Sequence, residues 1–415
     1  MRLLKIGVYY PTYLEQFYAR REGLAAEPSA AQHAALMHDC FGSSDFWTNA
    51  LAGRGYETCD IVANAEPLQK RWAEERGVRY REDGWLFEIT AAQIKAFRPD
   101  VIIVADYTTV TAPFIRLLRD ENPSLRLVLG WCGAPYADPS VFRACDAVLS
   151  CVPELVEHFR AEGHRCHHLD HAFEPRVLGR LDPATEPAVD FSFIGSVVNQ
   201  RRFHQGREKL LTELVERTGL RIWSEIERAA PRKRRTERAR RLVGGGVRLA
   251  QRVGVPPAFM ARGPLVWRAM DFASRPAPAP SVDARIARRA RPPLFGLDMF
   301  RQLRASRVAL NTHIDISTDN ASNMRLFEAT GVGACLLTDW KANLPRLFEP
   351  DAEVVTYRGT DECVEKVKYL LDHKSERRAV AAAGQRRTLR DHTFARRAER
   401  LDGIIKEELA GGTRG

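Results

Sequence analysis

Short apolar runs alternate with amphipathic segments in the first part of the chain. The runs have the length of buried strands and lie at residues 3–10, 58–63, 100–105, 125–129 and 147–151. Between them, residues 91–97, 112–121 and 153–163 have the apolar spacing of helices. Strands that alternate with helices of this length predict a parallel sheet that is covered by helices on both faces.

A second series of the same kind begins at residue 189. Its expected strands lie at residues 189–194, 220–223, 308–314, 335–338 and 353–357. Residues 322–330 and 362–372 are expected to form helices between these strands. The pattern therefore predicts an α/β fold with two doubly wound units in tandem.

The chain has 415 residues, which is more than one hydrophobic core usually organises. We expect an N-terminal domain at residues 1–172 and a C-terminal domain at residues 173–393. Residues 228–292 are expected to be a helical insertion in the second domain. Residues 394–415 are expected to form a helix that returns toward the first domain.

The net charge of +10 is concentrated in residues 228–292, which hold seventeen basic residues and three acids. This segment has an excess of +14, so the rest of the chain carries −4. Its arginines are interleaved with apolar residues, which suits peripheral contact with an anionic membrane surface. A solvated basic face that binds acidic glycans is an equal alternative, and nucleic acid is a less favoured third one.

The eight cysteines are scattered and form no CxxC pair, which favours a reduced, cytoplasmic protein. No apolar run approaches the ~18 residues of a spanning helix, so any contact with the inner face of a membrane is expected to be peripheral. A cluster of histidines and one cysteine has spacing that matches no standard zinc pattern. We expect no metal there and assign the cluster to packing between the domains. Its members are His164, Cys166, His167, His168 and His171.

The end of the expected strand at residues 308–314 is the main candidate for a binding site, because ligands of parallel sheets lie at the carboxyl ends of strands. Ser322 is a candidate N-cap, and the free backbone N–H groups beside it favour a phosphate. Arg325 adds a cation. Glu328 follows on nearly the same helix face, where its carboxylate can accept hydrogen bonds from sugar hydroxyls. From spacing alone, Arg325 and Glu328 are equally well explained as an exposed ion pair.

Several stretches resemble one family of enzymes. Residues 306–393 include SRVALNTHI, NMRLFEATGVGACLLTD and VEKVKYLLDH, which are similar to the C-terminal domain of group 1 glycosyltransferases, in the spore-maturation-protein-like branch. VDFSFIGSVVNQRR at residues 189–202 resembles the start of that domain. The resemblance implies the GT-B architecture, two Rossmann-like domains facing across a cleft. It also implies a hexosyltransferase-type enzyme that takes a sugar from a nucleotide-diphosphate donor.

The resemblance assigns roles to residues of the second domain. The donor would be held around Ser322, Asn323, Arg325 and Glu328, and Glu328 matches the second glutamate of the family's paired-glutamate motif. Asn320 stands where the first glutamate is common, which leaves the contacts of the donor sugar open. A retaining, metal-independent reaction with no cofactor besides the donor is implied.

Other residues are expected to contact the diphosphate of the donor. Gly195 and Ser196 follow a strand and would let a loop approach the phosphates. Arg201, Arg325 or Lys341 would stabilise the negative charge of the leaving diphosphate.

The acceptor is expected at the carboxyl ends of the N-terminal strands. Asp106 is the preferred carboxylate for binding or activating it, although a loop aspartate often only caps a turn. His171 and His313 are alternatives near the cleft, and His313 is also counted among the donor-binding residues. The acceptor itself is expected to be a glycan, a lipid-linked glycan or a protein.

Two further function classes fit the same sequence. A sugar-nucleotide epimerase on this fold would interconvert donor sugars without an acceptor. A protein that binds nucleic acid or membrane through residues 228–292 would bind with a steep dependence on salt.

Overall fold

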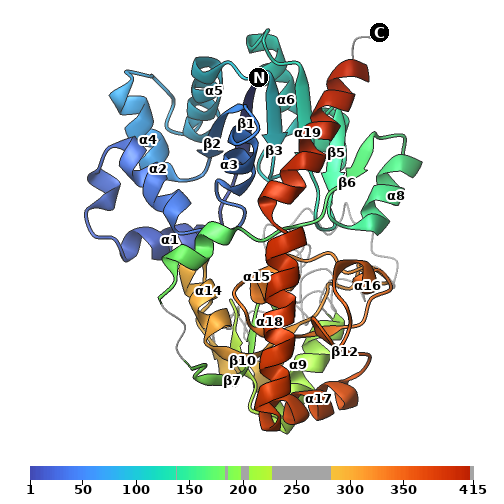
Figure 1. The fold of residues 1–415 in the computed structure, drawn as a ribbon. Coiled ribbons are helices and arrows are strands. Elements are labelled where there is room, and N and C mark those ends of the chain that lie inside the picture. The colour runs from blue at the N-terminus through green and yellow to red at the C-terminus, as the bar shows by residue number, and fades with distance from the viewer. Residues whose placement is uncertain (137, 183–185, 198–204, 227–281, 412–415) are drawn as a thin grey trace, which may run out of the picture.

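The computed structural model contains two parallel α/β domains, one above the other in Figure 1. It describes the chain except for residues 137, 183–185, 198–204, 227–281 and 412–415. Each domain holds a sheet of six parallel strands, in the order β2-β1-β3-β4-β5-β6 in the first and β12-β11-β10-β7-β8-β9 in the second. The prediction of two doubly wound α/β units is confirmed.

The first domain follows the predicted alternation. Its strands are β1 (Arg2–Gly7), β2 (Glu57–Val62), β3 (Val101–Val104), β4 (Leu127–Trp131), β5 (Ala147–Ser150) and β6 (Cys166–His168). Its helices are α1 (Pro11–Ala19), α2 (Ser29–His38), α3 (Phe46–Ala52), α4 (Glu66–Glu75), α5 (Trp85–Phe97), α6 (Ala112–Glu121), α7 (Ser140–Arg143) and α8 (Pro153–Ala161). All four residues of β3 are buried, because helices cover both faces of this parallel sheet.

The second domain repeats this arrangement after the short helix η2 (Pro175–Arg180). Its strands are β7 (Val189–Ile194), β8 (Arg221–Trp223), β9 (Ala290–Arg291), β10 (Ser306–Asn311), β11 (Cys335–Asp339) and β12 (Val355–Tyr357). Its helices include α9 (Gln205–Arg217), α13 (Ala284–Arg289), α14 (Gly296–Arg304), α15 (Arg325–Gly331), α16 (Leu344–Leu347) and α17 (Thr360–Asp372). The prediction that residues 290–291 belong to a helical insertion is wrong, because β9 pairs with β8 at the edge of the sheet.

The two segments that join the domains lie side by side. The Phe173 N–H donates to the His392 carbonyl at 2.8 Å, and the Phe394 N–H donates to the Phe173 carbonyl at 3.1 Å. The Phe173 ring also lies against Gly331, where an added Cβ would come within 2.3 Å of a ring atom. Gly331 is therefore needed for close packing between the domains, whereas Gly333, with a φ of +81°, makes the turn.

The last two helices cover one side of both domains. In Figure 1, α18 (Lys374–Asp391) runs along the second domain and α19 (Phe394–Gly411) continues along the first, where it packs on α3.

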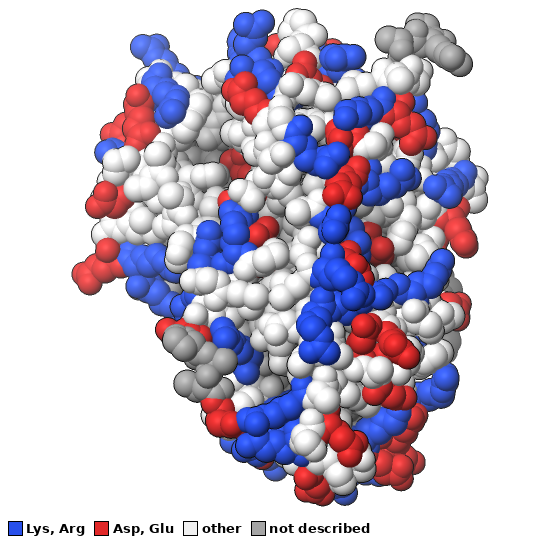
Figure 2. Space-filling model, viewed as in Figure 1, with Lys and Arg blue, Asp and Glu red and all other residues white. Residues whose placement is uncertain are grey.

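Figure 2 shows Lys and Arg side chains gathered over the junction of these helices, and Arg386, Arg390, Arg396 and Arg400 are exposed there. Positive surface is thus not confined to residues 228–292, of which only residues 282–292 are described. The expected partners of that segment stay predictions.

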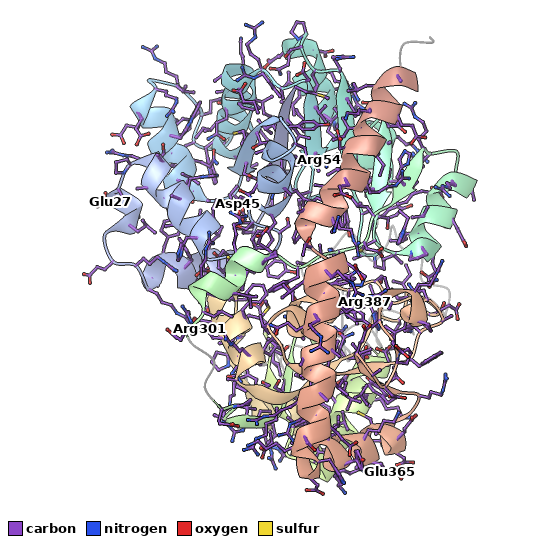
Figure 3. All side chains as sticks on the ribbon, viewed as in Figure 1. Glu27, Asp45, Arg54, Arg301, Glu365 and Arg387 are labelled. Atoms are coloured by element: carbon purple, nitrogen blue, oxygen red, sulfur yellow. The ribbon has the colours of Figure 1, made fainter. Side chains whose placement is uncertain are left out.

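A buried carboxylate anchors α19 to the first domain. Asp402 accepts a hydrogen bond from the Tyr56 hydroxyl at 2.7 Å and pairs with Arg54, which Figure 3 labels, at 3.1 Å. Burial alone would raise the pKa of Asp402, but the hydrogen bonds from Tyr56, Lys406 and Arg54 outweigh it and lower the pKa.

We expect Asp402→Asn to lower the free energy of unfolding by about 2 kcal/mol at neutral pH, because Arg54 loses its buried partner. A carboxyl group whose pKa is lower in the folded state stabilises the fold fully only above its unfolded-state pKa of about 4. This contribution is lost as the pH falls further, through the pKa of the folded state, so the difference between the two proteins should shrink below about pH 4. Urea unfolding of both proteins at several pH values measures it. A difference that stays constant down to low pH would contradict the assigned role.

Among the described residues, no helix has both the length and the apolar character needed to cross a bilayer.

Candidate functional site

A cavity of about 390 Å³ lies between the two domains. The first domain contributes Tyr10, Phe41, Gly42, Gly133, Ala134 and His171 to its lining. The second domain contributes the ends of β7 and β10, the start of α14 and the loop that leads into α15. Because both strands end here, the cavity occupies the position where parallel sheets bind ligands.

Arg325 and Glu328 lie together on the wall formed by the second domain. The Arg325 Nη1 is 2.8 Å from the Glu328 Oε2, and the two side chains are 17% and 8% exposed. They form the expected ion pair, but it is buried against the cavity and not exposed to solvent. Burial raises the pKa of Glu328, and the neighbouring Arg325 offsets part of that rise. Glu328 therefore takes up a proton at higher pH than an ordinary glutamate.

The loop before α15 differs from the prediction. The helix begins at Arg325 with Met324 as its N-cap residue, so the assignment of Ser322 as N-cap is wrong. The Ser322 hydroxyl instead lies 2.8 Å from the Ser317 hydroxyl, which holds the loop, and Ser322 still lines the cavity. β10 ends at Asn311, which leaves a loop of thirteen residues, 312–324, before the helix.

Asn323 and Arg325 carry buried polar atoms that are free to form further hydrogen bonds. The Asn323 Nδ2 donates to the Asn311 Oδ1 at 2.7 Å, but its Oδ1 is buried and has no hydrogen-bond partner in the described part of the chain. The Arg325 Nε is also buried without such a partner. Both residues line the cavity, where a bound molecule can satisfy these atoms.

Arg207, on α9, is a cavity residue that the sequence analysis missed. Its guanidinium donates to the Ser196 carbonyl at 2.9 Å and to the Thr312 carbonyl at 2.8 Å, which fixes it at the ends of β7 and β10. Burial lowers the pKa of Arg207 to about 10, and nearby acids, Asp339 first among them, oppose that shift. The group therefore stays charged at neutral pH. Two guanidinium groups, those of Arg207 and Arg325, thus line one cavity.

The predicted phosphate loop is only partly described. Gly195 follows β7 directly, and its N–H donates to the Trp223 carbonyl at 3.2 Å. Ser196, the next residue, lines the cavity. Arg201 lies outside the described residues. Among the described residues that follow this loop, Arg207 lines the cavity.

His313 and Lys341 lie behind the cavity wall. The His313 Nδ1 is 2.7 Å from the Asp339 Oδ1, and its side chain is fully buried. Burial would raise the pKa of Asp339, but His313 and then Lys341 outweigh it and lower the pKa. The Lys341 Nζ is 3.6 Å from Asp339 and donates to the Thr318 carbonyl at 2.9 Å. These residues hold the loop before α15, and the structure does not bring them into the lining of the cavity.

Asp106 also lies apart from the cavity lining. Its carboxylate accepts hydrogen bonds from the Thr109 N–H at 2.7 Å and from the Thr108 hydroxyl at 2.9 Å, which is the turn-capping alternative. His171 does line the cavity. Burial, with a smaller contribution from Arg397, lowers its pKa to about 4, so its imidazole is neutral at physiological pH.

Three aromatic residues form an aromatic wall in the same cavity. Tyr10 and Phe41 come from the first domain and Phe295 from the second, and their ring centroids lie 5.5 to 6.3 Å apart. Tyr13 stacks behind Phe41 at 3.8 Å. Aromatic faces of this kind contact apolar rings and the apolar faces of sugars.

Two histidines of the crossover cluster lie beside carboxylates. The His167 Nε2 is 2.7 Å from the Glu408 Oε1 of α19, and the His168 Nε2 is 3.3 Å from the Asp170 Oδ1. Within the described ranges, no group of three or more His, Cys, Asp or Glu residues is arranged to hold a metal ion.

Comparison with known proteins agrees with this geometry. Residues 228–403 match the family model described as glycosyl transferase-like. This part of the chain resembles glycosyltransferases. No curated protein matches the chain significantly. The spore-maturation-protein-like branch stays a prediction.

Three solved structures share the fold across both domains. Anabaena HepE, solved with UDP and glucose, has a TM-score of 0.53 at 8% identity and covers 98% of this chain and 100% of its own. The sucrose-phosphate synthase of Thermosynechococcus elongatus has a TM-score of 0.51 at 10% identity, with 99% of each chain covered. The glycosyltransferase AviGT4 has a TM-score of 0.51 at 12% identity, over 99% of this chain and 98% of its own. The predicted GT-B architecture is confirmed.

Proposed function

We propose that the protein transfers a sugar from a nucleotide-diphosphate sugar to a hydroxyl group of an acceptor, with retention and without a metal ion. The observation that carries the proposal is that two guanidinium groups, those of the buried Arg207 and the partly buried Arg325, line the cavity between the domains. The likeness of residues 228–403 to glycosyltransferases supports it. Anabaena HepE, which shares the fold, was solved with UDP-glucose.

The two guanidinium groups are suited to stabilise the negative charge of the leaving diphosphate. Breaking the bond between the anomeric carbon and the diphosphate leaves negative charge on the diphosphate and positive character on the sugar. Arg207 and Arg325 stabilise the first of these charges. Their carbonyl and carboxylate partners fix them before the substrate binds, so little reorganisation is needed in the transition state.

Glu328 is assigned to the ribose of the donor. Its carboxylate faces the cavity from the first turn of α15 and accepts hydrogen bonds from ribose hydroxyls, and Arg325 holds it in place. Among the described lining residues, Glu328 is the one carboxylate, and it belongs to the donor side. We therefore assign the proton of the acceptor hydroxyl to the leaving phosphate oxygen, which requires attack from the face of the leaving group and gives retention.

A thermal-shift series tests the proposal. Uridine, guanosine, adenosine, cytidine and thymidine diphosphates and their glucose esters are added to the full chain. We expect the diphosphate of one of these nucleosides to raise the unfolding temperature, since a ligand that binds only the native state stabilises it. The sugar ester of that base should then release nucleoside diphosphate on incubation. If no nucleotide shifts the transition and none is hydrolysed, the proposal fails.

A further inference from the structure

A second, larger cavity lies within the first domain. It measures about 750 Å³ and is bounded by α2, α4 and α5 at the outer side of β2. β2 is the edge strand of its sheet and pairs with β1 alone, so its outer edge faces the cavity. The role of this space is not explained by the donor site.

The walls of this cavity are mainly apolar. They include Trp72, Phe97, Leu68 and, near the mouth, the exposed residues Ala34 on α2 and Ala96 on α5. Two arginines lie on the aromatic rings, Arg76 at 4.7 Å from the Trp72 centroid and Arg2 at 4.6 Å from the Phe97 centroid. Both have acidic partners, Glu75 and Glu57, so the cavity offers no uncompensated cation among these residues. This lining favours a neutral ligand.

Two amide oxygens in the cavity require hydrogen-bond donors. Gln69 is 1% exposed, and its Nε2 donates to the Val62 carbonyl at 3.0 Å, which fixes the amide. Its Oε1 is buried and has no partner in the described chain, and the same holds for the Oε1 of Gln93. A buried oxygen without a donor is energetically unfavourable. An O–H or N–H group of a ligand removes this cost.

A smaller cavity lies beside both this space and the donor site. It measures about 160 Å³ and shares Met37, Asp60, Ile61 and Val62 with the larger cavity. It shares Tyr10, Phe41 and Gly42 with the cavity between the domains. The buried ion pair of Lys5 and Asp60, 2.9 Å apart at paired positions of β1 and β2, lines the smaller cavity. The three cavities are therefore neighbours, from the edge of β2 to the aromatic wall.

We propose that the cavity at the outer edge of β2 binds the body of the acceptor, a neutral, mainly apolar small molecule that carries O–H or N–H groups. The inference rests on the proposed function. The reacting hydroxyl extends past Phe41 into the donor cavity. There its oxygen forms a bond to the anomeric carbon, the bond from that carbon to the diphosphate oxygen breaks, and the proton passes to the diphosphate. A polysaccharide or protein acceptor would not use the apolar walls.

Tryptophan substitutions at the mouth test this assignment. The probe is β-naphthol, a neutral fused ring with one hydroxyl, and its binding to the full chain is followed by fluorescence. We expect Ala34→Trp and Ala96→Trp each to weaken binding about tenfold or more, because the new side chain occupies the space of the ring. Ala31→Trp is the matched control: Ala31 is exposed on the same helix but does not line the cavity. It should change binding by less than about twofold.

Donor hydrolysis separates this inference from the proposed function. All three variants should hydrolyse the donor at the wild-type rate, since the substituted positions lie outside the donor cavity. Absent or unsaturable binding of β-naphthol to the wild type, or binding that neither Ala34→Trp nor Ala96→Trp weakens, overturns the inference. If the tryptophans block binding but no donor is ever hydrolysed, the second site stands and the proposed function fails.

Discussion

Glu328→Gln is expected to raise the KM for the donor by about 10- to 100-fold, because hydrogen bonds to a charged acceptor contribute about 1.5 to 3 kcal/mol. Glutamine keeps the shape of the side chain but removes the negative charge that the ribose hydroxyls and Arg325 share. The freed Arg325 keeps its place in the cavity beside the diphosphate, so kcat should fall less than the affinity for the donor. Steady-state kinetics with varied donor concentration measures both parameters.

The pH dependence of KM provides a second measurement of the same residue. Burial raises the pKa of Glu328, so the wild-type carboxylate takes up a proton as the pH falls from neutral, earlier than an exposed glutamate would. The KM of the wild type should therefore rise on acidification, while that of Glu328→Gln stays flat. Glu365→Gln is the control, since Glu365 is exposed on α17, at the far end of the second domain in Figure 3. A flat wild-type profile contradicts the ribose assignment.

The sequence predicts the sheet well because its strands are apolar runs of distinctive length. The segments expected at residues 58–63, 100–105 and 147–151 appear as β2, β3 and β5, within two residues at each end. β6 and β9 could not be found in the same way. β6 is the sequence Cys-His-His and β9 has two residues, so neither contains an apolar run. Both owe their extended shape to pairing with a neighbouring strand.

The residues of the candidate site also differ in whether the sequence predicts them. Ser196, Ser322, Asn323, Arg325 and Glu328 line one cavity, and each stands next to a predicted strand end or helix start. Phe41 and Phe295 could not be predicted as members, because they come from connecting segments whose path depends on packing between domains. Without coordinates, no pattern distinguishes an aromatic residue in such a wall from one in the core.

Arg207 is a cavity residue that sequence spacing alone could not identify. Arg201, Arg202 and Arg207 all precede or begin the same helix, and an arginine at a helix start is usually solvated. The position of Arg207 depends on two carbonyl groups, those of Ser196 and Thr312, which are 116 residues apart in sequence and meet only when β7 pairs with β10. Strand pairing therefore places the Arg207 guanidinium in the cavity.

Replacing Arg207 with methionine is expected to lower kcat by about 100- to 1,000-fold, the loss typical when one fixed donor to a developing anion is removed. Methionine fills much of the same volume, so the donor KM should change less than kcat. Arg207→Lys should recover only part of the rate, because one ammonium group cannot replace the planar fork that bonds two carbonyl groups. Single-turnover measurements of nucleoside diphosphate release follow the chemical step directly.

Loss of activity in Arg207→Met must be separated from loss of fold. The Ser196 and Thr312 carbonyls lose a donor, which lowers the free energy of unfolding by about 1 to 3 kcal/mol. The assay temperature is therefore set below the onset of unfolding of the variant. Arg217→Met is the matched control, since Arg217 is exposed near the end of the same helix and pairs with Asp361 at 2.6 Å. If folded Arg207→Met released the diphosphate as fast as Arg217→Met, the leaving group would not depend on this guanidinium, and Arg325 alone would have to stabilise it.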